Sequence, residues 1–147
     1  MTLAFRNVDA SPNDPVGTWP LEAIHTALER GSLEHWRRLA AAIRADPWGP
    51  VARSVGEVLT CSRPYGVAEL MDQLICSARS RREAEERAEV AEEISRLLAA
   101  SGMSRQEFAR RIGTSASRLS TYLSGRVVPS AALMVRVRRL ARQQGSR

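Results

Sequence analysis

Long stretches rich in Ala, Leu, Arg and Glu fill most of this chain, and short clusters of Pro, Gly and Ser interrupt them. These four residue types favour helices, whereas Pro and Gly end them. Within each stretch, apolar residues recur every three or four positions, as on one face of an amphipathic helix. A chain of 147 residues is long enough for one or two small domains with a buried core. The sequence therefore predicts an all-α fold.

The first half of the chain predicts an arm and a helical domain. Residues 1–18 are rich in Pro, Asn, Asp and Gly, so we expect an extended or disordered arm. Residues 19–76 predict a helical N-terminal domain that dimerises, binds a partner protein or senses a ligand, with Thr18 capping its first helix. The expected apolar faces are Leu21, Ile24, Ala27 and Leu28; Leu33, Trp36, Leu39, Ala40 and Ile43; Val51, Val55, Val58 and Leu59; and Leu70, Met71, Leu74 and Ile75.

Residues 77–89 predict a charged helical connector between two domains. Ala is the only apolar residue type in this segment, and Arg and Glu occur at helical spacing. Arg79 and Glu83, for example, are four residues apart, and each such pair stabilises a helix by about 0.2–0.5 kcal/mol. A coiled coil that binds a partner is less favoured, because the segment lacks a sustained Leu or Ile heptad.

Charge is distributed unevenly along the chain. The net charge is +6, and all 22 basic residues are Arg. Residues 1–89 contain 11 Arg and 13 acidic residues, a balance of −2, whereas residues 90–147 contain 11 Arg and 3 Glu, a balance of +8. A small domain with this excess of positive charge attracts polyanions.

The sequence offers no catalytic or metal-binding set. Cys61 and Cys76 form no CxxC pair, and His25 and His35 stand apart from them, so we expect no metal and no cofactor. Two lone thiols fit a reducing cytosol. No apolar run approaches the ~18 residues of a membrane span, and we find no signal peptide pattern. We expect a cytoplasmic protein that is not an enzyme.

The most informative pattern lies in residues 90–142, which predict a four- to five-helix domain. Ser104 and Glu107 have the spacing of a capping box, in which each side chain bonds the other residue's backbone N–H. Gly113 supplies the left-handed residue that a tight interhelical turn needs, and Ser115 or Thr114 is expected to cap the next helix. The expected inward-facing residues are Val90, Ile94, Leu97, Leu98, Met103, Phe108, Ala109, Leu119, Tyr122, Leu133, Met134, Val137 and Leu140.

This pattern resembles the phage-repressor (Xre/Cro-like) helix-turn-helix family. The matching residues are Ser104, Glu107, Phe108, Ala109, Ile112, Gly113, Ser115, Leu119, Ser120, Tyr122, Leu123, Ser124, Gly125, Pro129 and Ser130. The resemblance covers the C-terminal domain only. It implies a domain that binds double-stranded DNA and whose third helix enters the major groove.

The resemblance also implies which side chains meet DNA. The residues expected to read bases are Ala116, Ser117, Arg118, Ser120 and Thr121. The residues expected to contact phosphates are Arg105, Ser115, Ser124, Arg126 and Ser130. Arg118 is the one long side chain of the first group, and it suits either a guanine edge or a phosphate.

We therefore expect a bacterial, nucleoid-associated transcriptional regulator that binds specific DNA sequences as a homodimer, with repression as the favoured outcome. An alternative is the antitoxin of a toxin–antitoxin pair, which would bind a toxin through its N-terminal half and repress its own operon. A third possibility is a protein-interaction module whose basic domain meets DNA without sequence preference.

The uneven charge generates a first prediction. Residues 90–147 alone should bind DNA, and residues 1–89 alone should not, because the excess of Arg lies in the second fragment. The logarithm of the affinity should fall with the logarithm of salt concentration, by about 0.9 for each neutralised phosphate. Fluorescence anisotropy with labelled duplexes measures both fragments, and DNA binding by residues 1–89 would contradict the assignment.

Overall fold

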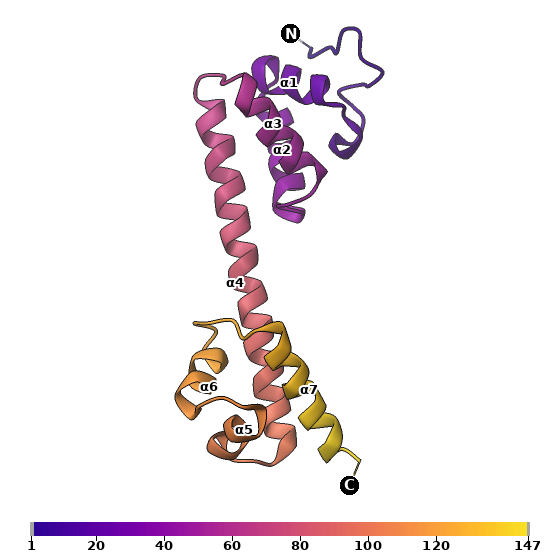
Figure 1. Cartoon of the computed structure of the whole chain (residues 1–147). Helices are drawn as coiled ribbons and strands as arrows, with labels where there is room; N and C mark the ends of the chain where they lie inside the picture. Colours follow the sequence, from indigo (N-terminus) through magenta and orange to yellow (C-terminus); the bar gives the residue numbers. More distant parts are fainter. Residues whose placement is uncertain (1, 147) are drawn as a thin grey trace. The chain divides into compact units, whose positions relative to one another are not determined.

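The computed structural model describes residues 2–146, and all of its regular elements in that range are helices. The all-α fold predicted from the sequence is confirmed. Contacts divide the chain into two compact units, Met1–Arg82 and Glu83–Arg147, which we call the N-terminal and C-terminal units. One long helix, α4 (Val67–Ser101), contributes residues to both units (Figure 1).

The N-terminal unit packs its helices around a single apolar core. Its elements are the 3-10 turn η1 (Val16–Thr18), α1 (Leu21–Arg30), α2 (Leu33–Ala45), α3 (Pro50–Cys61) and the first part of α4. Ser32 caps α2, as the sequence predicts, and its backbone N–H donates to Nδ1 of His35 at 3.1 Å. The fully or nearly fully buried residues include Ala23, Ile24, Leu28, Leu39, Ile43, Val55 and Met71.

Two apolar residues expected in this core are exposed instead. Leu70 is 49% exposed, because the buried face of α4 follows Met71, Ile75 and Ala78, and Leu70 lies about 100° away from Met71 around the helix. Leu33 is 53% exposed. It is the first residue of α2, where the side chain points back beyond the helix end.

The N-terminal arm is irregular but packs against the core. Leu3, Phe5 and Val8 contact the core cluster. The guanidinium of Arg38 donates to the backbone oxygens of Pro12 (2.6 Å) and Asp14 (2.5 Å), and it lies 5.1 Å from the ring centre of Trp19. Arg38 thus holds the arm by its main chain, and the three apolar side chains hold it by packing on the core.

The prediction that Thr18 caps the first helix is wrong. The hydroxyl of Thr18 donates to the backbone oxygen of Pro15, and α1 begins only at Leu21, after Pro20. Pro20 has the extended backbone of a residue that precedes a helix, so the helix cannot start closer to Thr18.

The middle of α4 holds the turn between α2 and α3. Arg79 Nε donates to the backbone oxygen of Pro47 at 3.0 Å, and a nitrogen of Arg82 donates to that of Ala45 at 3.1 Å. Trp48, which is 43% exposed, lies against this turn with the Arg79 guanidinium 5.8 Å from its ring centre. Arg79, which the sequence pairs with Glu83, thus binds a backbone carbonyl of the neighbouring turn.

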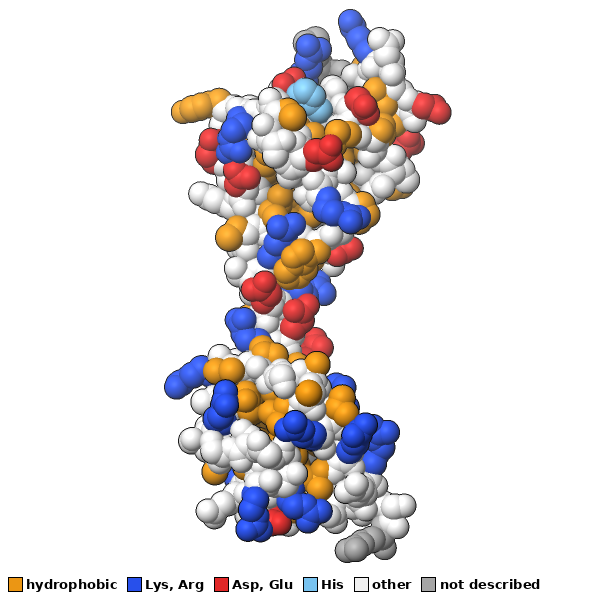
Figure 2. Space-filling view, viewed as in Figure 1, with side chains coloured by type: hydrophobic (Ala, Val, Ile, Leu, Met, Phe, Trp, Pro, Cys, Tyr) orange, Lys and Arg blue, Asp and Glu red, His pale blue; other side chains and the backbone are white. Residues whose placement is uncertain are grey.

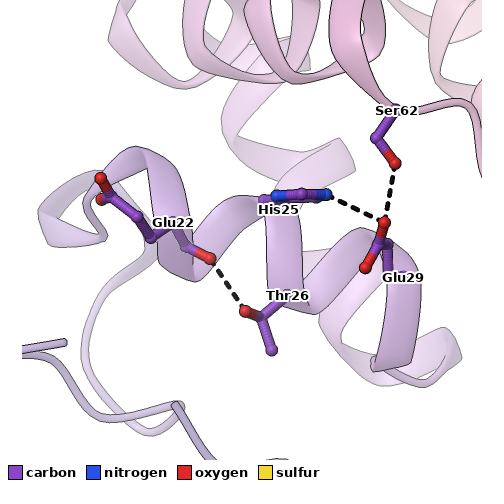
Figure 3. Close-up of polar contacts among 5 residues, drawn as sticks. All are labelled: Glu22, His25, Thr26, Glu29 and Ser62. Carbon is purple, nitrogen blue, oxygen red and sulfur yellow. Dashed lines mark hydrogen bonds and ion pairs between the residues drawn. The ribbon is translucent and has the colours of Figure 1, made fainter. Parts of the chain in front are cut away.

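A polar cluster joins α1 to the end of α3 (Figure 3). The hydroxyl of Ser62 donates to Oε1 of Glu29 at 2.8 Å, and Nε2 of His25 lies 2.9 Å from the same oxygen. These hydrogen bonds, that from Ser62 first and then that from His25, lower the pKa of Glu29 below its ordinary value. A carboxylate whose pKa is lower in the folded state stabilises the fold above its unfolded pKa, and this contribution disappears as pH falls through the folded pKa.

This cluster generates a second prediction. Ser62→Ala should raise the pKa of Glu29 towards its ordinary value, because the largest stabilising hydrogen bond to the carboxylate is lost. NMR titration of the Glu29 carboxyl carbon measures the change. Thr26→Ala is the matched control, since the Thr26 hydroxyl donates to the backbone oxygen of Glu22 and not to a carboxylate (Figure 3). An unchanged pKa in Ser62→Ala would contradict the prediction.

The C-terminal unit has its own apolar core, separate from that of the N-terminal unit. Its helices are the last part of α4, α5 (Arg105–Ile112), α6 (Ala116–Leu123) and α7 (Ala131–Gln144). The buried residues are Ile94, Phe108, Ala109, Ile112, Leu119, Tyr122, Leu133, Met134, Val137 and Leu140, with Val90, Leu97, Leu98, Met103 and Leu123 partly buried around them. Every inward position expected from the sequence lies in this cluster.

The turn between α5 and α6 has the geometry that the sequence predicts. Gly113 adopts φ 81° and ψ 37°, the left-handed conformation, and the next N–H, that of Thr114, donates to the oxygen of Ala109 at 2.9 Å. Of the two candidate caps for α6, Ser115 takes the role, accepting from the N–H of Arg118 at 3.2 Å. The short turn brings α6 against the buried, small Ala109.

Only half of the expected capping box forms at α5. The hydroxyl of Ser104 accepts from the N–H of Glu107 at 3.2 Å. The carboxylate of Glu107 binds the guanidinium of Arg110, one turn further along the helix. A cation at this distance competes with the neutral backbone N–H of Ser104, because hydrogen bonds between charged groups are stronger.

The turn generates a third prediction. Gly113→Val should destabilise the C-terminal unit, since a β-branched residue at positive φ is strained by about 1–2 kcal/mol. Ala109→Leu should force extra volume into a packed contact, at a cost of about 1–3 kcal/mol. Chemical denaturation measures both variants, with Ala99→Leu on the exposed face of α4 as the control for the added side chain. Unchanged stability in both variants would contradict this placement of the turn.

Candidate nucleic-acid interface

The outward face of α6 is polar and its inward face anchors the helix. Leu119 and Tyr122 are buried in the core of the C-terminal unit. The opposite arc presents the five residues that the sequence proposes as base readers: Ala116, Ser117, Arg118 and Ser120 are exposed, and Thr121 is half-buried. The structure therefore brings these five side chains together on one surface.

The hydrogen-bonding capacity of this surface is small outside Arg118. The hydroxyl of Thr121 donates to the backbone oxygen of Arg118 at 2.7 Å, which leaves its oxygen as an acceptor. The hydroxyls of Ser115 and Ser117 lie 3.3 Å apart. Ala116 offers only a methyl group. Arg118 is the side chain with several donors in a fixed plane.

A hollow of about 880 Å³ lies between the first turns of α5 and α6. Both helix caps, Ser104 and Ser115, line it, and both helix N-termini carry partial positive charge and free N–H groups. Arg118 also lines the hollow, so this residue borders both the outward face of α6 and the space between the helices. The carboxylate of Glu107 lines the hollow too, but it is bound by Arg110, so the helix N-termini and Arg118 suit an anion such as a backbone phosphate.

Six residues of this hollow are absent from the site predicted from the sequence, namely Ser104, Gln106, Glu107, Arg110, Gly113 and Thr114. Gln106 is the second residue of α5, and Thr114 follows the turn glycine. The signal was present in the sequence, because a side chain in the first turn of a helix lies beside that helix's own N-terminus. Arg110 could not be anticipated, since its position depends on Glu107, which binds it.

The residues proposed as phosphate contacts lie in several places. Arg105 is the exposed first residue of α5, and Ser115 lines the hollow between α5 and α6. Arg126 is exposed in the loop after α6, and Ser130 caps α7 by accepting from the N–H of Leu133 at 3.1 Å. Ser124 lies apart from the first hollow. Its hydroxyl donates to the oxygen of Thr121, and it lines a second hollow beside α4.

Helix α6 itself has no acidic residue, and Glu107, which borders the hollow beside α6, is bound to Arg110. No Asp or Glu follows Glu107 in the sequence. Glu93 binds Arg138 through two hydrogen bonds of 2.8 and 3.2 Å, which fasten α7 to α4 and, through the bond from Arg138, lower the pKa of Glu93. Arg side chains are spread over the visible face of the C-terminal unit (Figure 2). The charged residues of the C-terminal unit are therefore mostly positive.

Other kinds of site are not found among the described residues. In residues 2–146 no three His, Cys, Asp or Glu side chains gather as metal ligands. In the same range no helix is both long and apolar enough to span a bilayer.

Comparison with known proteins identifies the C-terminal unit. A family model described as helix-turn-helix matches residues 94–140, from the end of α4 into α7. No curated protein and no solved structure matches the chain. The match supports a DNA-binding transcription regulator and covers the turn, the caps and the exposed face described above. Residues 94–140 of this chain are therefore an Xre/Cro-like helix-turn-helix domain.

Proposed function

We propose that the protein binds specific sequences in double-stranded DNA as a homodimer and represses transcription at the bound site. The observation that carries this proposal is the exposed, acid-free face of α6, presented by a helix whose Leu119 and Tyr122 are fixed in the core. A helix that is already fixed in this way loses little conformational entropy when it enters the major groove.

The two kinds of contact have separate sources on this surface. Ser117, Ser120, Thr121 and Arg118 reach base edges from α6, while the methyl of Ala116 suits thymine. The hollow between α5 and α6 receives a phosphate, with the helix N-termini and Arg118 lining it, and Arg105 contacts the backbone from the exposed start of α5. Phosphate contacts fix the register of α6 on the duplex, and only the base contacts carry sequence information.

Two copies are needed because one short helix covers only a few base pairs. Helix-turn-helix dimers read two half-sites about one helical turn apart, which makes the operator palindromic. A protein seated in this way occupies the groove and the flanking backbone. Repression follows when that site overlaps a promoter.

Selection of duplexes from a random pool with the purified full-length protein tests the proposal. An enriched palindrome with half-sites about one turn apart is the expected result. Equal affinity for all duplexes would instead identify a non-specific DNA-binding module and overturn the proposal. An enriched single half-site would overturn the homodimer.

A fourth prediction separates base reading from backbone contact. Arg118→Ala should cost about 1–3 kcal/mol on the selected sequence and relax the preference at one base pair, because the variant loses the bidentate donor. Arg105→Ala should weaken binding to all sequences alike.

The measurement is titration of both variants against the selected duplex and a panel of single-base substitutions. Arg139→Ala, an exposed arginine of α7, is the control for the loss of one positive charge. If Arg118→Ala lowers the affinity for every duplex equally, Arg118 is a backbone contact within the hollow.

A further inference from the structure

The hollow between α5 and α6 contains an ion pair in its wall. The Nη2 atom of Arg110 donates to Oε2 of Glu107, which lies one turn earlier in α5, and both residues line the hollow. The same hollow is the place where a backbone phosphate is proposed to bind. The guanidinium therefore borders the anion site while a carboxylate of the chain itself occupies it.

The ion pair is exposed and therefore weak. The side chain of Arg110 is 77% exposed and that of Glu107 is 35% exposed. Water and salt screen pairs of this kind, and holding two long side chains in one geometry costs conformational entropy, so an exposed pair contributes little to stability. A stronger anion can take the arginine at a small cost.

A phosphate of the DNA backbone is the stronger partner for Arg110. A guanidinium binds phosphate at two points through parallel N–H groups, and a compact carboxylate pair at the surface lacks this support from further donors. Each two-point fork of the guanidinium includes Nη2, the nitrogen that Glu107 occupies. A phosphate bound in this way would lie against the same nitrogen as the carboxylate, and two negative groups so close together repel.

A second partner for the Glu107 carboxylate lies in the same helical turn. Glu107 is the third residue of α5, and the hydroxyl of the cap residue Ser104 accepts from its N–H at 3.2 Å. In a complete capping box, the side chain at this third position accepts from the backbone N–H of the cap residue. Ser104 has the extended backbone of such a cap, with φ −68° and ψ 158°. Rotation of the Glu107 side chain is sufficient to complete the box.

We propose that Arg110 moves from Glu107 to a DNA phosphate when the duplex binds, and that the released carboxylate accepts the N–H of Ser104. Each charged group then has a partner in both states. The free protein contains the pair of Glu107 with Arg110, and the complex contains the contacts of Arg110 with phosphate and of Glu107 with Ser104. This inference rests on the proposed function, because it takes the anion in the hollow to be a phosphate of bound DNA.

Titration of full-length variants with the selected duplex tests the exchange. Arg110→Ala should weaken binding and should lower the slope of log affinity against log salt by about 0.9, because one phosphate contact is lost. Glu107→Gln should tighten binding by about two- to five-fold, since Arg110 no longer leaves an ion pair when it meets the phosphate. Glutamine at this position also completes a capping box, so this variant should keep its fold.

Arg111→Ala is the matched control. Arg111 is an exposed arginine of the same helix that does not line the hollow, so its loss removes one charge without removing the phosphate contact. Equal salt slopes for Arg110→Ala and Arg111→Ala would overturn the contact of Arg110 with phosphate. Weaker or unchanged binding by Glu107→Gln would show that the carboxylate does not compete for Arg110 and would overturn the exchange. Circular dichroism checks that all variants keep the wild-type helix content.

The new position of the carboxylate has a signature of its own. Hydrogen exchange of the Ser104 amide, followed by NMR in isotope-labelled protein, should slow when DNA is added to the wild type. Glu107→Ala is the control for shielding by the duplex alone, because this variant has no side-chain acceptor for the Ser104 N–H. If DNA protects the Ser104 amide equally in both proteins, the capping step is overturned.

Failure of this proposal is distinguishable from failure of the proposed function. A phosphate contact does not depend on base sequence, so the same titrations are made with a duplex of arbitrary sequence. If no sequence is selected but Glu107→Gln still binds more tightly than the wild type, the exchange stands and specific recognition falls. If a palindrome is selected but Glu107→Gln binds it more weakly, the exchange falls and the proposed function stands. Absence of binding to any duplex would overturn both.

Discussion

Burial of Leu119 and Tyr122 in the C-terminal core is the interaction on which the DNA-binding surface depends. Helix α6 has only eight residues, too few to be stable in isolation. Its two anchors supply that stability and also fix its rotation, so that the polar arc from Ala116 to Thr121 faces outward. The left-handed turn at Gly113 and the small Ala109 allow α6 to approach α5 closely enough for this burial.

Local signals in the sequence were sufficient for most of the C-terminal unit. Caps, the turn glycine and apolar spacing all act within a few residues, so Ser115, Gly113 and the buried positions could be placed without knowledge of the tertiary fold. Contacts between distant segments could not. The bond from Arg138 to Glu93 and those from Arg38 to the N-terminal arm join residues 24 to 45 positions apart.

The same distinction explains the errors. Leu70 belongs to an apolar run, and the sequence does not say which side of a long helix meets the core. Glu107 fits a capping box, but Arg110 offers its carboxylate a stronger partner. The hollow between α5 and α6 combines the first turns of two helices, and its residues become neighbours only when both helices are in place. The family resemblance identifies the residues proposed to read bases, and the burial of their neighbours Leu119 and Tyr122 leaves them on the outward face of α6.

The way in which Arg38 holds the N-terminal arm has a consequence for sequence drift. Its guanidinium binds the backbone oxygens of Pro12 and Asp14, and a carbonyl oxygen is present whatever the side chain. Substitutions at those two positions therefore leave the acceptors intact, while the arginine itself has no equivalent replacement, since lysine cannot span two acceptors with a planar fork. At Pro12 and Asp14 this constraint therefore lies in a residue outside the arm, while Leu3, Phe5 and Val8 constrain the arm through their packing on the core.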